Sequence, residues 1–554
     1  MLNKYLRQIR FSFIKRTMFS LKLLTVFVIL NPTFSFCLKA KKSAFDTSNP
    51  TSFLAFNFIS SSLAANEKLI ISSTSPKADE TNVSIVDSFT VTFSTTIDQK
   101  SISSSTVSLL DTSTNQSMAL EFTSSESTLT ISHSPLQLGR TYRLTIKGGD
   151  SGVFSQKANK LSSDFSFSFT TGTATNLSGG NGLNFNVNQI ARSPNLVVHN
   201  SKLYAFWSEI DPTFYQVKGR EITFTSSNPS VISNSSGAVN ENFVYPMVFN
   251  SNLYLYYSFG TINRFTKFNS NLNWTVPTNL VTCSNPSKII SPEFRIISQN
   301  SDLYLIQDES NCIASRVVRV YQSTNSGTSW SSIVGPVDSS SINPSGNSDH
   351  NLPDIIYFNS NLYATYVDGC DANCSVKFTR YLGTSTWSTP ITISDSTSNV
   401  SDFPAYLSRM FIFNNKLYIV YTQVISGVSR LRVKVFNGST SSPAWTAVDN
   451  STGINFDLSK KATRQFPFIY KSNLYIIWSE LNSSLNSVIR LKSYNGNDSA
   501  PVWTVLDGGG ENGLNVYANR GAFDPAVIEF NGKVYGVWSE TGTTSNVFLS
   551  QLPL

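Results

Sequence analysis

A chain of 554 residues is too long to fold around one hydrophobic core, so we expect two or more domains. Only 14% of the residues are charged, against about 25% in soluble domains, which favours strands and turns over helices held by Glu–Lys pairs. The formal net charge of +7 includes six basic residues and no acidic residue in positions 1–36, and removing those six leaves +1. A nearly neutral mature chain gives no reason to expect a nucleic-acid partner.

The N-terminus has the order of a secretory signal peptide. Basic residues come first, an apolar run follows at residues 23–30, and Asn31-Pro32 ends it. The run is too short to cross a bilayer as a stable helix, so residues 1–36 are predicted to be a signal that is removed on export. A start at Met18 would give a more compact signal than a start at Met1.

The segment Phe34-Ser35-Phe36-Cys37 resembles a bacterial lipobox, in which the cysteine becomes the lipidated first residue of the mature chain. It departs from that pattern at Phe36, where a small residue is usual. The alternative is an ordinary cleaved signal peptide. The resemblance implies membrane attachment through lipidation of Cys37 at the cell surface or outer membrane, whereas the alternative implies a secreted protein.

Four further cysteines form an even set in a chain that is predicted to be exported, where disulfides persist. Cys370 and Cys374 flank a tight loop that a local disulfide would close, which leaves Cys283 and Cys312 as the remaining pair. These scattered thiols and three isolated histidines make no recognisable metal-ligand set, and we predict no metal and no cofactor.

Residues 37–65 read as a disordered, Ser-rich linker, and a series of strands with alternating apolar residues follows. The strands are expected at residues 89–93, 106–110, 127–131, 141–146 and 165–171. Their spacing suits a sandwich of two sheets.

Short motifs in this region resemble the bacterial Ig-like domain of S-layer proteins. They are Ser75-Pro76, Val-Thr-Phe-Ser at 91–94, Leu-Gly-Arg-Thr-Tyr-Arg-Leu-Thr at 138–145 and Phe-Thr-Thr-Gly at 169–172. The resemblance implies an Ig-like β-sandwich over residues 66–173 that serves as a spacer or cell-surface module and has no catalytic position.

From residue 190 onward one phrase returns seven times: a proline, a few strand residues, an Asn-containing turn, and Leu-Tyr or Val-Tyr in a second strand. The copies run from Pro194 to Tyr204, Pro246 to Tyr254, Pro292 to Tyr304, Pro353 to Tyr363, Pro404 to Tyr418, Pro467 to Tyr475 and Pro525 to Tyr535. Asn and Gly tolerate the positive φ angles of tight hairpin turns. Because a second pair of strands follows in most copies, we predict a seven-bladed β-propeller over residues 174–554, in an all-β chain.

The last copy is too short to supply four strands. The segment 506–515 aligns with 177–184, which places the residues near 171–176 at the position of an outer strand. We therefore predict that a strand from the N-terminal side closes the ring and places the Ig-like domain directly against the seventh blade.

The repeats resemble sialidase-like and kelch-like propellers without matching one family. Residues 323–330 resemble the Asp-box of sialidase-type propellers, with Asn325 in the Asp position, which implies a hairpin-turn device and no chemistry. The Phe/Tyr-Arg-Ile-Pro signature of sialidases has only a partial echo at Phe294-Arg295-Ile296-Ile297, in the third repeat, so Arg295 is expected to be an ordinary strand residue.

In a propeller, the loops that enter each first strand and leave each second strand lie on one face, where polar side chains form a candidate binding site. The candidates are Arg192, Arg464 and Arg520 with Glu209, Glu480 and Glu540, and further acids are Asp308 or Glu309 and Asp368. One interpretation is a pocket for a carboxylate or sugar acid. The other is repeat architecture, in which Arg–Glu pairs tie the blades together and Trp207, Trp478 and Trp538 pack between sheets.

The sequence thus predicts an exported binding or adhesion protein whose propeller engages a protein or glycan ligand at the cell surface. A sialidase-type hydrolase and a structural envelope protein are the alternatives. No Gly-x-Ser-x-Gly elbow, zinc-binding His pair or phosphate loop appears, which favours a non-enzyme.

Overall fold

A computed structural model describes residues 68–210, 215–223, 231–233, 244–259, 262–268, 275, 278–279, 290–310, 316–334, 342, 352–368, 375–395 and 408–554. The predicted signal and linker, with Cys37, and the cysteines at 283, 312, 370 and 374 lie outside these residues, so the anchor and the disulfides stay predictions. The prediction of an all-β fold is confirmed, because the described elements are strands and one 3-10 helix, Gln99–Ser101. None of the described helices has the length and apolar character needed to cross a bilayer.

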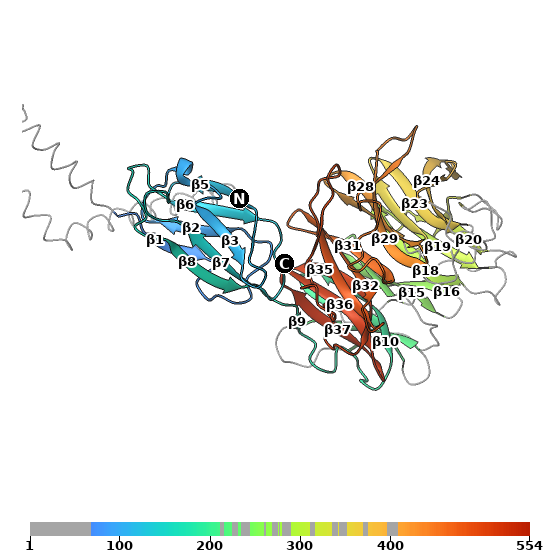
Figure 1. Cartoon of the computed structure of the whole chain (residues 1–554). Coiled ribbons are helices and arrows are strands. Elements are labelled where there is room, and N and C mark those ends of the chain that lie inside the picture. Colours follow the sequence, from blue (N-terminus) through green and yellow to red (C-terminus); the bar gives the residue numbers. More distant parts are fainter. Residues whose placement is uncertain are drawn as a thin grey trace, which may run out of the picture.

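The N-terminal unit is a sandwich of two four-stranded antiparallel sheets, as predicted (Figure 1). One sheet has the order β1 (Ile71–Ser75), β2 (Phe89–Phe93), β6 (Thr128–His133), β5 (Leu120–Ser125). The other has the order β4 (Gln116–Ser117), β3 (Val107–Asp111), β7 (Thr141–Ile146), β8 (Phe165–Thr170). Apolar residues at every second position, such as those of Phe-Thr-Val-Thr-Phe in β2, point into the core, which is how a strand covers one face of a sheet.

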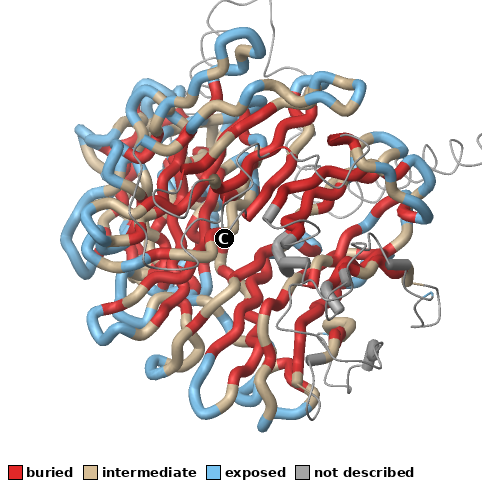
Figure 2. The backbone as a smooth tube through the Cα atoms, turned by 90° about the vertical axis from the view of Figure 1, so that its right-hand side faces the viewer, coloured by how far each residue is buried: buried red, intermediate tan, exposed pale blue. Residues whose placement is uncertain are grey.

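The remainder is a propeller. Its described residues form seven sheets of antiparallel strands, and the first strands of neighbouring sheets lie next to each other, with β10 contacting both β14 and β35. In Figure 2 the buried strands of these sheets surround a common centre. The first three sheets are β10 (Ala191–His199), β11 (Lys202–Ile210), β12 (Tyr215–Glu221), β13 (Val231–Ser233); β14 (Val244–Phe249), β15 (Asn252–Phe259), β16 (Ile262–Lys267), β17 (Thr278–Asn279); and β18 (Ile290–Gln299), β19 (Asp302–Ser310), β20 (Arg316–Ser323), β21 (Ser331–Ser332). The fourth and fifth sheets are β22 (Asp354–Phe358), β23 (Asn361–Asp368), β24 (Ser375–Gly383), β25 (Thr386–Trp387), with β26 (Ile391–Thr392) also on β24; and β27 (Ser408–Phe413), β28 (Lys416–Ile425), β29 (Val428–Phe436), β30 (Trp445–Ala447). The sixth and seventh sheets are β31 (Ala462–Tyr470), β32 (Asn473–Leu481), β33 (Ser487–Tyr494), β34 (Trp503–Val505); and β35 (Gly521–Phe530), β36 (Lys533–Thr541), β37 (Ser545–Leu552) with β9 (Thr175–Asn176).

Tight turns join the first two strands of each sheet, as the repeated phrase predicts. Asn200 and Ser201 have φ angles of 49° and 58°, and Asn359 and Ser360 have 45° and 60°. Two successive residues with positive φ define the type I′ turn, whose twist matches that of the flanking strands. The Asp-box-like segment is likewise a turn, since Asn325 Oδ1 accepts hydrogen bonds from Ser323 Oγ and the Ser329 N–H, both at 2.9 Å.

The closing strand is also confirmed. β9 pairs with β37, with Asn176 opposite Ser550 and Thr175 opposite Gln551, and the Leu177 N–H donates to the Leu549 carbonyl at 2.8 Å. The outer strand of the last sheet therefore comes from the segment that follows the Ig-like sandwich (Figure 1). This arrangement covers the edge that β37 would otherwise expose.

The sandwich packs directly against the sixth and seventh sheets. A single cluster of buried apolar side chains includes Phe169 of the sandwich, Tyr475 of β32 and Leu552 of β37. Polar contacts cross the same boundary: the Ile85 N–H donates to the Pro553 carbonyl at 3.2 Å, the Gln137 amide donates to the Val505 carbonyl, and Lys471 forms an ion pair with Asp87.

We predict that Leu177→Pro destabilises the propeller by about 1–3 kcal/mol, because proline removes the N–H that bonds to Leu549. The matched control Leu177→Ala keeps this N–H and should unfold at a urea concentration close to that of the unmodified protein. Equal unfolding midpoints for the two variants would contradict the role of this strand.

Candidate functional site

A cavity of about 100 Å³ lies where the first strands of the propeller sheets converge, and all seven repeats contribute to its wall. Its lining residues come from the N-terminal ends of β10, β14, β18, β27, β31 and β35 and from the residues just before β22. They are Ser193, Pro194, Asn195, Val244, Tyr245, Phe294, Arg295, Leu352, Pro353, Arg409, Arg464, Gln465, Phe466, Asp524, Pro525 and Ala526. Pockets with mainly apolar walls and a few polar groups are the usual form of ligand sites.

β-Bulges in three neighbouring sheets present the backbone to this cavity. The pairing register shifts between Arg192 and Asn195 in β10, with equivalent shifts in β31 and β35. The first residues inside these bulges are Ser193, Arg464 and Asp524, and their φ angles are 51°, 57° and 55°. A left-handed conformation is costly for residues other than glycine, and such strain concentrates at binding and catalytic sites.

Three arginines and two carboxylates surround the cavity. Asp354, which is 1% exposed, lies between Arg295 (Nε to Oδ1, 3.5 Å) and Arg409 (Nη1 to Oδ1, 3.9 Å). Its other oxygen accepts the Met410 N–H at 2.6 Å. Arg464 forms an ion pair with Asp524 of the next sheet. Each of the two carboxylates therefore has an arginine beside it.

Two buried atoms at this site have no hydrogen-bond partner among the described residues, namely Arg295 Nε and Asp354 Oδ1. They attract each other as an ion pair, but their separation of 3.5 Å is long for a hydrogen bond. Buried polar atoms without a partner are rare in folded proteins, and a ligand or an ordered water is the usual explanation.

Of the three arginines proposed from the sequence, only Arg464 lines the cavity. Arg192 precedes the bulge in β10 and is equivalent to Thr463 and Phe523, since each pairs with the serine of a Trp-Ser-Glu phrase. Arg520 lies in the loop that precedes β35. Its guanidinium is 4.3 Å from the Tyr517 ring and donates to Asn546 Oδ1 at 3.1 Å.

Two cavity arginines were not predicted. Arg295 was expected to be an ordinary strand residue, but the structure places it in the wall, with its guanidinium 5.0 Å from the Tyr245 ring. No candidate motif in the sequence includes Arg409. The two arginines occupy the same position of the third and fifth repeats, each nine residues before the tyrosine of its Leu-Tyr pair, and alignment on the proline did not bring this position out.

The three predicted glutamates have a shared structural role. Glu209, Glu480 and Glu540 are at most 1% exposed, and each accepts the indole N–H of the tryptophan two residues earlier, at 2.7–2.9 Å. Each also accepts two successive backbone N–H groups of the loop that enters its sheet: Phe185 and Asn186, Phe456 and Asp457, or Val516 and Tyr517. This geometry fits the interpretation that these glutamates serve the repeat architecture. Their hydrogen-bond donors are backbone N–H groups and indoles, however, and not the arginines that this interpretation expected.

The other acids proposed from the sequence also lie outside the cavity wall. Glu309 is buried and accepts hydrogen bonds from Gln307 Nε2 at 2.7 Å and from the Tyr321 hydroxyl at 2.5 Å. Asp308 is buried beside it, and Asp368 ends β23.

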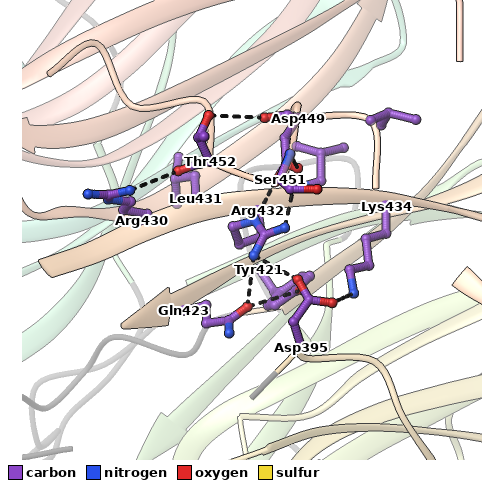
Figure 3. Close-up of polar contacts among 12 residues, drawn as sticks. Asp395, Tyr421, Gln423, Arg430, Leu431, Arg432, Lys434, Asp449, Ser451 and Thr452 are labelled. Carbon is purple, nitrogen blue, oxygen red and sulfur yellow. Dashed lines mark hydrogen bonds and ion pairs between the residues drawn. The ribbon is translucent and has the colours of Figure 1, made fainter. Parts of the chain in front are cut away.

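The fifth sheet has a charged variant of this arrangement (Figure 3). The buried Arg432 donates to Asp449 Oδ2 at 2.5 Å and to Gln423 Oε1 at 3.2 Å, and it pairs with Asp395 Oδ2 at 2.8 Å. Lys434 forms an ion pair with the same Asp395. Burial would raise the pKa of Asp395, but Lys434 and Arg432 outweigh it and hold that pKa below its usual value of 3.8.

Comparison with known proteins identifies one part of the chain. Residues 65–171 match the family model of the bacterial Ig-like domain. The N-terminal sandwich is a bacterial Ig-like domain. No curated protein matches the chain.

Solved structures with some likeness to the chain are glycoside hydrolases and sialidases. The sialidase of Trypanosoma rangeli with bound sialic acid is 12% identical, with 69% of this chain and 57% of the other covered and a TM-score of 0.37. An endo-arabinase from Bacteroides thetaiotaomicron is 12% identical (56% and 93% covered, TM-score 0.31). The α-L-arabinofuranosidase Arb93A from Fusarium graminearum is also 12% identical (56% and 92% covered, TM-score 0.37). Likeness at this level does not extend to ligand or activity.

We predict that Glu540→Ala destabilises the protein by about 3 kcal/mol, because it leaves the Trp538 indole and two backbone N–H groups buried without an acceptor. Glu529→Ala, at an exposed position of the same sheet, should change the free energy of unfolding by less than about 0.5 kcal/mol. Chemical denaturation of both variants measures the difference, and similar losses would argue against the buried acceptor.

We predict that Asp395 stabilises the fold at neutral pH but not in acid. Its pKa is lowered in the folded state, so its stabilising contribution is present above the usual value of 3.8 and is lost as pH falls through the folded value. The difference in urea midpoint between the unmodified protein and Asp395→Asn should therefore be largest near pH 7 and shrink below about pH 4. Glu121→Gln, at an exposed position of the Ig-like domain, is the control and should show no such trend. A difference that grows in acid would refute the prediction.

Proposed function

We propose that the protein is an exported binding protein that holds a carboxylate-bearing sugar in the cavity on the propeller axis. The observation that carries this proposal is the set of three arginines, Arg295, Arg409 and Arg464, around a cavity to which all seven repeats contribute. Guanidinium groups bind carboxylates through charge-assisted, often bidentate hydrogen bonds.

The rest of the wall supports a sugar as the body of this ligand. Ser193 and Asn195 bring a hydroxyl and an amide to the wall. Ser193 Oγ donates to Asp524 Oδ2 at 3.5 Å and Asn195 Nδ2 to the Val244 carbonyl at 2.8 Å, so their oxygens would serve as acceptors for sugar hydroxyls. Phe294 and Phe466 bring apolar surface for the C–H groups of a sugar ring. The volume of about 100 Å³ admits a small group, so the acidic end of the ligand would enter and the remainder would lie outside.

The arrangement of acidic residues at the site supports binding rather than hydrolysis. Most glycoside hydrolases use a pair of carboxylates on either side of the scissile bond. Among the described lining residues only Asp524 is acidic, and it is paired with Arg464. Asp354 is buried behind Arg295 and Arg409.

A sialidase-type hydrolase is the second candidate, because that chemistry uses a tyrosine nucleophile and Tyr245 lines the cavity beside Arg295. Release of dye from an aryl sialoside, abolished by Tyr245→Phe, would establish it. Binding of the acid without turnover supports the binding protein.

The proposed location is the cell surface, with the Ig-like domain as a spacer. The basic-then-apolar order of residues 1–36 and the bacterial Ig-like domain support it. Attachment through a lipid on Cys37 belongs to the same proposal, and mass spectrometry of the mature N-terminus tests it.

We predict that the protein binds D-glucuronic acid or N-acetylneuraminic acid and does not bind galactose, as measured by isothermal titration calorimetry. Arg409→Met should weaken the binding of the acid at least about tenfold, because it removes one charge-assisted contact, while Arg295 stays beside Asp354. Arg143→Met, at an exposed site of the Ig-like domain, is the matched control and should leave the affinity unchanged. Equal binding of neutral and acidic sugars would overturn the proposal.

A further inference from the structure

Two contacts of the Ig-like domain lie at the end of the propeller where the first and second strands of each sheet are joined. Lys471, in the turn between β31 and β32, forms an ion pair with Asp87 of the sandwich. The Ile85 N–H donates to the carbonyl of Pro553, which follows β37. Because the last residue of β37 pairs with Val534, just after the turn between β35 and β36, both contacts lie at the same end of the ring.

The cavity lies at the other end of these strands. Its lining residues Arg464 and Asp524 are close to the first residues of β31 and β35, whereas Lys471 and Gly532 follow the last residues of the same strands. A strand rises about 3.3 Å per residue, so the seven residues from Arg464 to Lys471 span about 20 Å. The length of the first strands therefore separates the cavity from the contacts with Asp87 and Ile85.

The chain enters the Ig-like domain at the end that faces away from the propeller. Ser94, which follows β2, donates from Oγ to the Lys68 carbonyl at 3.1 Å and from its N–H to the Ile70 carbonyl at 2.9 Å. Asp87, which contacts the propeller, precedes β2. Lys68 and Asp87 therefore lie at opposite ends of the sandwich, about 20 Å apart along the direction of β2 (Figure 1).

The two units follow each other along the axis of the ring. Figure 2 is turned by 90° from Figure 1 and looks onto the common centre of the propeller sheets, so the axis runs across Figure 1 from the sandwich through the propeller. The joint is closely packed, since a Cβ added at Gly172 would lie 2.7 Å from Pro553 Cβ, and Phe169 shares an apolar cluster with Tyr475 and Leu552. Packing of this kind holds the two units in one orientation.

The distance from Lys68 to the cavity exceeds the reach of the predicted linker. The path crosses the sandwich and then the first strands of the propeller, about 40 Å in all. The predicted linker, residues 37–65, contains 29 residues, and a flexible chain of that length has a root-mean-square span of about 30 Å. The cavity would therefore not fold back to a membrane that holds Cys37, and a ligand in that membrane would have an effective concentration near zero at the cavity.

We infer that the cavity faces away from the cell that carries the protein and binds its carboxylate-bearing ligand on an opposing surface. This inference rests on the proposed function, including attachment on the N-terminal side of the Ig-like domain. It names the kind of partner, which is a ligand displayed on a second surface and not a component of the protein's own envelope. A small ligand free in solution would reach the cavity in any orientation, so a fixed distance from the membrane serves a surface-bound partner.

Aggregation of two sets of vesicles tests the inference. The mature chain, with a histidine tag in place of residues 1–37, is held on phosphatidylcholine vesicles by a nickel-chelating lipid. A second set of phosphatidylcholine vesicles carries a lipid with a glucuronate headgroup, and light scattering measures aggregation. The two sets should aggregate, and free D-glucuronate should prevent it. Arg409→Met should slow aggregation at least about tenfold, and the control Arg143→Met should leave the rate unchanged.

Glucuronate lipid placed in the protein's own vesicles separates the two orientations. It should leave the rate of aggregation with the second set unchanged, because the cavity does not reach the acid beside its own anchor. A Gly-Ser insertion after residue 65 that triples the linker is the matched control. The same lipid should then occupy the cavity and slow aggregation at least about tenfold, because a tethered ligand within reach has an effective concentration in the millimolar range.

The outcomes separate the inference from the proposed function. If neither free D-glucuronate nor the glucuronate vesicles bind, the proposed function fails. If free D-glucuronate binds but the two sets of vesicles do not aggregate, the inference is refuted and the cavity site stands. The same conclusion follows if the Gly-Ser insertion makes no difference to the effect of glucuronate lipid in the protein's own vesicles.

Discussion

The pairing of β9 with β37 is the contact on which the rest of the structure depends. The last sheet holds only three strands from the C-terminal end of the chain, and residues Thr175–Asn176 supply the fourth. Because the ring is closed, β10 and β35 become neighbours, and residues far apart in the sequence meet at one cavity. The same pairing leaves few residues between β8 and β9, so the Ig-like domain packs against the propeller and shares its apolar cluster. Closure thus determines both the site and the position of the spacer.

Within the ring, residues that recur and residues that do not have different roles. The recurring glutamates and tryptophans hold the loops that enter three adjacent sheets by satisfying buried N–H groups. In the fifth sheet, the buried Arg432 forms ion pairs with Asp395 and Asp449. Arg295 and Arg409 occupy one shared register position in the third and fifth sheets. The equivalent residues of the other sheets are Asn195, Tyr245, Asp354, Phe466 and Ala526. Conserved residue types at a repeated position therefore serve the architecture here, whereas the candidate site uses a repeated position at which the residue type varies from sheet to sheet.

Much of the fold follows from local signals in the sequence. Asn-Ser and Asn-Gly pairs between apolar runs predict the hairpins because these residues accept positive φ, and the likeness of segments 177–184 and 506–515 predicts the closing strand. The residues of the candidate site were harder to predict from the sequence. Alignment on the repeated proline grouped Arg192 with Arg464, but the bulges place Arg192 one position earlier in its strand.

Arg295 and Arg409 lie more than a hundred residues apart, but each stands nine residues before the tyrosine of its Leu-Tyr pair. Only the strand pairing around the closed ring brings them to opposite sides of Asp354. Asp354 has the same spacing to Tyr363 in the repeat between them, so alignment on the Leu-Tyr pair indicates this cluster, whereas alignment on the proline, whose distance from Leu-Tyr varies, does not.

The most direct measurement of the central claim is a crystal structure of the full mature chain soaked with D-glucuronate. The account predicts density for the sugar acid in the axial cavity, with its carboxylate within about 3 Å of guanidinium nitrogens of Arg295, Arg409 or Arg464. Density for the sugar acid elsewhere, with the three arginines bonded only to Asp354 and Asp524, would contradict it.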